Sequence, residues 1–146
     1  MNRSASAARS ARSSSVPLRA FGSNAASPRP RNRAQVLQLI SSTVHLSEAI
    51  RFAAMTTALG SPVRLLFLAD GVRGLARGQE AHLLAPPIGR MLSGIVTDTA
   101  PALVHAPSLA ARGLDRADLV DGVPVELLDD AGAAGWVRHA RRVVPF

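Results

Sequence analysis

Three apolar runs, at residues 36–40, 63–68 and 102–105, are followed or ended by polar side chains that could do chemistry. In open parallel sheets, ligands bind in the crevice outside the carboxyl ends of the strands. Two imidazoles and a carboxylate at that edge are donor types that suit a metal or an anion. The candidate pocket residues, in chain order, are Ser42, His45, Asp70 and His105.

A second interpretation of the same residues needs no ligand. A Ser after a strand is an ordinary capping residue, an Asp before Gly is an ordinary turn, and one His at a strand end is usually a satisfied polar residue. We favour this interpretation and keep the ligand pocket as the alternative. We therefore assign no catalytic residue, no metal ligand and no cofactor from the sequence.

The chain lacks the residue that thiol chemistry requires. Its 146 residues include no Cys, which excludes disulfides, thiolate metal sites and a cysteine nucleophile within this sequence. The glycine-rich segment 71–78 matches neither the dinucleotide-binding nor the P-loop pattern, and no Ser lies in a GxSxG context. We interpret the segment 71–78 as a flexible loop.

The positive charge is concentrated at the start of the chain. The formal net charge is +7, from 17 basic and 10 acidic residues. Residues 1–33 contain seven Arg and no acid, so residues 34–146 carry 10 Arg and all 10 acids and are neutral. A neutral domain does not indicate nucleic-acid binding. No apolar run is long enough to span a membrane, so we expect no membrane partner.

We expect residues 1–33 to be a disordered Arg-, Ser- and Ala-rich tail, because its few large apolar residues cannot offset the entropy of ordering. The same composition is typical of an organelle transit peptide, and it also fits a start codon assigned too far upstream. Too few aromatic residues accompany the arginines for base stacking, which disfavours a nucleic-acid-binding tail. We expect a cytoplasmic protein, with an organelle as the alternative.

From residue 34 onward, apolar runs alternate with helical stretches, which is the pattern of a parallel sheet covered by helices. The predicted strands are 36–40, 63–68, 102–105, 123–128 and 142–146. The predicted helices are 46–59, 87–95, 108–113, 115–122 and 129–141, with Ser108 and Asp115 as caps of the two short ones. The sequence thus predicts an α/β fold, a three-layer α/β/α sandwich with a mostly parallel five-stranded sheet.

The most specific motif lies in the last third of the chain. Residues 108–114 read Ser-Leu-Ala-Ala-Arg-Gly-Leu, residues 118–123 read Asp-Leu-Val-Asp-Gly-Val, and residues 142–146 close with Arg-Val-Val-Pro-Phe. Together these motifs resemble the DsrE/DsrF-like sulfur-relay family over residues 36–146. The resemblance implies the same five-stranded sandwich and a homo- or hetero-oligomer of DsrE-like subunits.

The resemblance also implies where the family's chemistry is carried. Active members hold sulfur as a persulfide on a cysteine just after the third strand, eight residues before the Gly that corresponds to Gly113. That position is His105 in this chain. A persulfide needs a thiolate, which imidazole cannot supply. We therefore expect a non-catalytic subunit or interaction module, with a small-molecule or metal-binding α/β protein that uses the strand-end pocket as the alternative.

Overall fold

The computed structural model describes residues 36–78 and 87–146. The predicted tail, residues 1–33, lies outside the described residues. Five strands form one sheet: β1 (Val36–Ile40), β2 (Val63–Phe67), β3 (Ala102–His105), β4 (Val125–Leu128) and β5 (Arg142–Pro145). Their order is β4-β3-β2-β1-β5, and every pairing is parallel. The predicted fold class is confirmed, and the sheet is entirely parallel.

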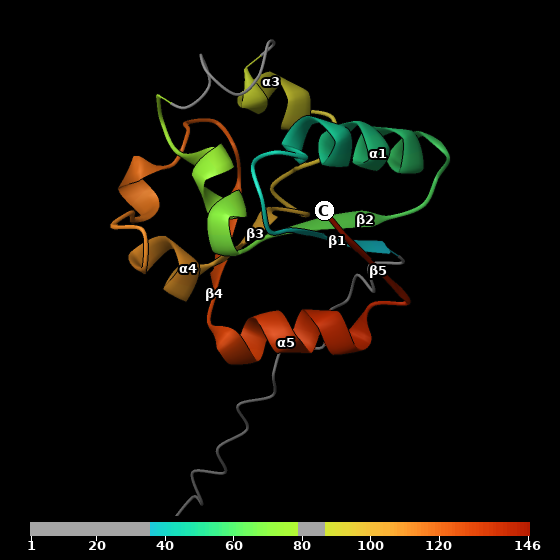
Figure 1. Cartoon of the computed structure of the whole chain (residues 1–146). Coiled ribbons are helices and arrows are strands. Elements are labelled where there is room, and N and C mark those ends of the chain that lie inside the picture. Colours follow the sequence, from blue (N-terminus) through green and yellow to red (C-terminus); the bar gives the residue numbers. More distant parts are fainter. Residues whose placement is uncertain (1–35, 79–86) are drawn as a thin grey trace, which may run out of the picture. The chain divides into compact units, whose positions relative to one another are not determined.

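Helices cover both faces of this sheet. The α-helices are α1 (Leu46–Ala58), α3 (Ile88–Leu92), α4 (Ala106–Ala110) and α5 (Asp130–His139), and the 3₁₀ helices are η1 (Ala69–Leu75) and η2 (Arg116–Asp118). Figure 1 shows α1 and α5 on opposite sides of the sheet. No helix in the described ranges has the length and apolar character that crossing a membrane requires.

The central strand β2 explains why two layers of helix are needed. All five of its residues are buried, as expected for a strand with helices on both faces. Leu65 and Phe67 belong to the larger core cluster, which includes the inner side chains of α1. Leu66 points to the other face and joins the smaller cluster, against which Trp136 of α5 packs.

The prediction of a flexible loop at 71–78 is wrong, because residues 69–75 form the helix η1. Val72 and Leu75 are fully buried and anchor η1 in the larger core cluster. A Cβ on Gly71 would lie 1.9 Å from the carbonyl oxygen of Ile40. Glycine is needed here for close approach of two backbone segments. The glycines that suggested a loop therefore permit tight packing.

The cap predicted at Ser108 is also wrong. Helix α4 begins at Ala106, and its N-cap is His105. Pro107 lies in the first turn, where the missing backbone N–H costs no helical hydrogen bond. Ser108 is consequently a buried residue inside the helix, and its hydroxyl is available for contacts outside α4.

The cap predicted at Asp115 is confirmed, although the helix that it begins is short. The Asp115 and Asp118 side chains form a reciprocal capping box around η2, which ends well before Gly122. Six other elements are shorter than predicted; α1, β2 and β5 each end one residue early. Helix α3 stops at Leu92, β4 starts after Pro124, and α5 stops at His139. At β4 the reason is that proline donates no hydrogen bond to a strand ladder.

Candidate functional site

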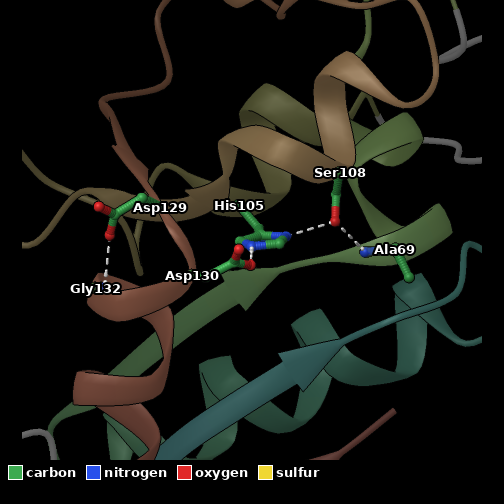
Figure 2. A network of polar contacts seen from close by, with 6 residues as sticks. All are labelled: Ala69, His105, Ser108, Asp129, Asp130 and Gly132. Atoms are coloured by element: carbon green, nitrogen blue, oxygen red, sulfur yellow. Dashed lines mark hydrogen bonds and ion pairs between the residues drawn. The ribbon is translucent and has the colours of Figure 1, made fainter.

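His105 lies at the carboxyl end of β3 and is the centre of a polar network (Figure 2). Its Nδ1 is 2.7 Å from Oγ of Ser108, and its Nε2 is 2.8 Å from Oδ1 of Asp130. The backbone N–H of Ala69 donates to the same Ser108 oxygen at 2.9 Å. The His105 side chain is 18% exposed, so the network lies at the boundary between core and solvent.

Three elements position these groups. Ser108 is three residues beyond the N-cap His105, a spacing at which side chains on a helical turn are neighbours. Asp130 is the first residue of α5, the helix that covers the face of the sheet opposite α1. The start of α5 is fixed by Asp129, whose carboxylate accepts a hydrogen bond from the backbone N–H of Gly132 at 2.7 Å. The network therefore joins β3, α4, η1 and α5.

The contacts are compatible with one arrangement of protons in which every group is satisfied. Ser108 Oγ accepts from Ala69, so its own proton can be donated to Nδ1 of His105. A neutral imidazole then carries its proton on Nε2 and donates it to the Asp130 carboxylate. Both ring nitrogens of His105 are thus engaged with protein groups. The imidazole has no free nitrogen for a metal or a substrate in this arrangement.

The network also holds a strained backbone residue. Ala69 has φ +49°, in the left-handed region that residues other than glycine rarely adopt. Its N–H donates to Ser108 at the junction between β2 and η1. Strain of this kind persists where the surroundings over-determine it. The hydrogen bond to Ser108 is one such restraint.

Asp70 adjoins the network through a different partner. Nε of Arg112 donates to Oδ1 of Asp70 at 2.8 Å, and Nη1 of Arg112 donates to the Ser108 carbonyl oxygen at 3.1 Å. Arg112 thereby ties η1 to α4. The carboxylate of Asp70 is occupied by this guanidinium and makes no hydrogen bond to His105 among the described residues.

Among the described residues, Ser42 and His45 form only local hydrogen bonds, at the start of α1. Ser42 Oγ accepts from the N–H of Val44 at 3.1 Å, and His45 Nδ1 lies 3.3 Å from Oε2 of Glu48. Ser42 does not cap α1, whose N-cap is His45. No hydrogen bond or ion pair joins any two of the four predicted pocket residues within 36–78 and 87–146. Of the four, Asp70 and His105 border the same network, through Ser108 and Arg112.

Within the two described ranges, no group of three or more His, Asp or Glu side chains could hold a metal ion. A cavity of about 190 Å³ lies elsewhere, between Arg77, Arg116 and the residues that lead into β4. None of Ser42, His45, Asp70 and His105 lines it. A ligand-binding role for these four residues stays a prediction.

Sequence reasoning missed Asp130 and the part that Ser108 plays. The rule that selected Asp70, a carboxylate directly after a strand, applies equally to Asp130 after β4. The sequence therefore did contain a signal for Asp130. The signal for Ser108 was Pro107, because a proline in the first turn indicates that the helix begins before Ser108.

A second polar side chain, Arg64, lies buried in β2 and was also missed. It is 7% exposed, and its Nη2 is 3.8 Å from Oε2 of Glu126. Its Nε has no hydrogen-bond partner among residues 36–78 and 87–146. Its guanidinium lies over the Trp136 ring, 4.9 Å from the centroid. Burial lowers the pKa of Arg64, and the nearby Glu126 charge partly opposes this. Arg64 is an incompletely compensated buried charge.

Comparison with known proteins identifies one matching family. The family model described as DsrE/DsrF-like matches residues 35–146. Among solved structures, a protein of unknown function from Methanobacterium thermoautotrophicum is 22% identical, with 70% of this chain and 86% of that chain covered and a TM-score of 0.49. No curated protein matches.

Proposed function

The chain belongs to the DsrE/DsrF-like family, and we propose that it serves as a non-catalytic subunit of a DsrE-like assembly. The observation that carries this proposal is the side chain at the end of β3. His105 stands where the family resemblance implies the sulfur-carrying cysteine, and the 146 residues contain no Cys. A persulfide forms only on a thiolate sulfur, so this chain has no atom on which to carry it.

The contacts of His105 support a structural role at that position. Both imidazole nitrogens are held by protein groups, and the ring joins α4 to the start of α5. We propose that, at the end of β3, a histidine whose orientation is fixed by this network takes the place of a reactive cysteine. The subunit would then contribute shape and contacts to an assembly in which a cysteine-bearing DsrE-like partner performs sulfur transfer.

The remaining parts of the proposal concern domains, partners and location. We propose that residues 34–146 form the DsrE-like domain and that residues 1–33 precede it as a tail. We propose homo- or hetero-oligomers with DsrE-like subunits and no nucleic-acid partner for the domain, since residues 34–146 are neutral overall. A cytoplasmic location is part of the proposal, with organelle targeting by the tail as the alternative.

The central test is sulfur loading of the full chain and of His105→Cys. Each protein is incubated with a low-molecular-weight persulfide carrying labelled outer sulfur. In His105→Cys, the cysteine thiolate attacks that sulfur, a new S–S bond forms, and the donor leaves as its thiolate. We expect label in His105→Cys and none in the parent chain, as measured by intact mass. Covalent label on the parent chain would overturn the proposal.

A matched control separates the position from the chemistry of any added thiol. Val137→Cys places a thiol on a partly exposed residue of α5, away from the strand end. We expect it to load more slowly than His105→Cys. Equal loading of both variants would contradict the proposal that His105 occupies the sulfur-carrying position. Copurification from the native source is the complementary test: a DsrE-like subunit with a cysteine is expected, and a homogeneous metal-binding protein without such a subunit would favour the alternative.

A further inference from the structure

A small cavity lies where the chain after η1 meets the segment between η2 and β4. Ala76 and Leu119 form an antiparallel bridge between these two segments. The backbone N–H of Arg77 extends the pairing, because it donates to the Asp118 carbonyl oxygen at 2.8 Å. The cavity beside this bridge has a volume of about 190 Å³. Two segments that are distant in the sequence are therefore held together at its wall.

The lining of this cavity carries more positive than negative charge. It includes two guanidinium groups, those of Arg77 and Arg116, and among the described residues that line it Asp121 is the one acid. The carboxylates of Asp115 and Asp118 are nearby in the sequence, but they accept hydrogen bonds from backbone N–H groups of η2. A site with a net positive charge favours anions.

The guanidinium of Arg77 has a fixed orientation. Its Nε donates to the Leu119 carbonyl oxygen at 3.0 Å, and its Nη2 donates to Oδ1 of Asp121 at 2.6 Å. A guanidinium has five N–H donors in a rigid fork, so these two bonds leave donors for a ligand. A group that is already oriented loses little conformational entropy when it binds.

The contact between Arg77 and Asp121 shows that an anionic oxygen fits beside this guanidinium. The two side chains are 55% and 85% exposed, and exposed ion pairs contribute little because water screens them. A dianion has twice the charge of the Asp121 carboxylate, and in the cavity it can contact Arg116 as well. Such a ligand therefore competes with Asp121 for Arg77.

The size of the cavity limits the class of ligand. Pockets for drug-sized molecules measure about 300 Å³ or more, so a cavity of about 190 Å³ suits a smaller molecule. Guanidinium groups bind phosphate-type oxygens through short, charge-assisted N–H bonds that are often paired. Two guanidiniums at a small cavity thus match a compact tetrahedral anion.

We propose that this cavity binds a small tetrahedral oxyanion, phosphate or sulfate, between the guanidinium groups of Arg77 and Arg116, with Asp121 as a competing carboxylate. The site is separate from the His105 network, because none of His105, Ser108 and Asp130 lines the cavity. The proposal goes beyond the subunit role and does not depend on it.

The test is isothermal titration calorimetry of the full chain with inorganic phosphate and with sulfate, at constant low ionic strength. We expect saturable binding by the parent chain. We expect Arg116→Gln to bind about 10-fold more weakly, the loss typical of one hydrogen bond to a charged group. Arg116 is exposed, so this change should leave the fold intact. Asp121→Asn should bind about threefold more tightly, because the competing carboxylate is gone and the Leu119 carbonyl oxygen still orients Arg77.

The matched control is Arg138→Gln, which removes the same charge from an exposed position on α5. Helix α5 contributes no residue to the cavity, so we expect this variant to bind as the parent chain does. The seven Arg of residues 1–33 are present in every variant, and differences between variants therefore report the cavity.

A parent chain without saturable binding of either anion would overturn the proposal, and so would an equal loss of affinity in Arg116→Gln and Arg138→Gln. Weaker binding by Asp121→Asn would overturn the competing role of Asp121. Phenyl phosphate distinguishes the source of the oxyanion. Binding tighter than that of inorganic phosphate would assign the phosphate group of a small organic molecule, and weaker binding would assign the free anion.

Discussion

His105 and Arg64 are both polar side chains that extend from the sheet to α5, but they differ in how many of their polar atoms have partners. His105 has a partner at each ring nitrogen and borders solvent through the exposed Asp130. Arg64 is more deeply buried, and within the part of the chain that the structure describes its Nε has no partner and its ion pair is a carboxylate 3.8 Å away. The comparison teaches that two polar side chains which bridge from neighbouring strands to α5 differ in compensation: His105, at the carboxyl end of β3, is fully partnered, whereas Arg64, in β2, is partnered only in part.

The energetic consequence of this difference follows from desolvation. A buried polar group that keeps its hydrogen bonds contributes modestly to stability, whereas one without a partner lowers it. Removing a partner from the His105 network should therefore destabilise the fold. Removing the Arg64 charge should not destabilise the fold. These expectations can be tested by substitutions on either side of the comparison.

The largest effect is expected for Ser108→Ala. This change removes the oxygen that accepts from Ala69 and contacts His105 Nδ1, and it releases the restraint on the left-handed Ala69. We expect the free energy of unfolding to fall by about 2 kcal/mol, in the range for a buried group left without its partner. Urea denaturation followed by circular dichroism measures it.

Ser93→Ala is the matched control for that change. Ser93 Oγ also bonds a group at a helix end, the Arg90 carbonyl oxygen at 2.8 Å, but this bond is exposed to solvent. We expect a loss below about 0.5 kcal/mol, as for surface substitutions in general. If both variants lost the same free energy of unfolding, the His105 network would contribute no more to stability than an exposed hydrogen bond does.

A smaller effect of opposite sign is expected for Arg64→Met. Methionine keeps a long apolar stem against Trp136 and removes a charge whose burial is incompletely compensated. Replacing buried charges by apolar residues of similar size is often neutral or stabilising. Allowing for the lost contact between the guanidinium and the Trp136 ring, we expect the free energy of unfolding to rise by about 1 kcal/mol. A loss of more than about 1 kcal/mol would show that Arg64 is compensated after all.

The same two regions show how much could be predicted from the sequence. Apolar runs located all five strands, and β1 and β3 to the residue. The signal is local, and it is strongest in β2, which is buried on both faces. It could not reveal η1, whose order depends on the burial of Val72 and Leu75 against distant segments. Glycine content in that segment indicated a loop, although Gly71 serves close packing against Ile40.

The candidate site was predicted in part for a similar reason. A rule about strand ends places Asp70 and His105 at the correct edge of the sheet, but it does not say which side chains face one another. Asp70 turns to Arg112, and His105 turns to Ser108 and Asp130. Which partner each side chain contacts depends on where α4 begins and on where α5 lies in space. Neither can be read from the spacing of residues along the chain. The burial of Arg64 could not be predicted, because one charged residue does not change the pattern of an otherwise apolar strand.

The smallest effect, and the sharpest probe of the comparison, is expected for Glu126→Gln. If Glu126 were the true counter-ion of Arg64, removing its charge would leave an uncompensated buried guanidinium and cost about 3–5 kcal/mol. The separation of 3.8 Å and the exposure of Glu126, whose side chain is 47% accessible, argue for a weak pair. We expect a loss of about 0.5 kcal/mol, typical of exposed ion pairs. A double-mutant cycle with Arg64→Met isolates the pair itself, and a coupling energy above about 2 kcal/mol would place Arg64 with His105 among the compensated groups.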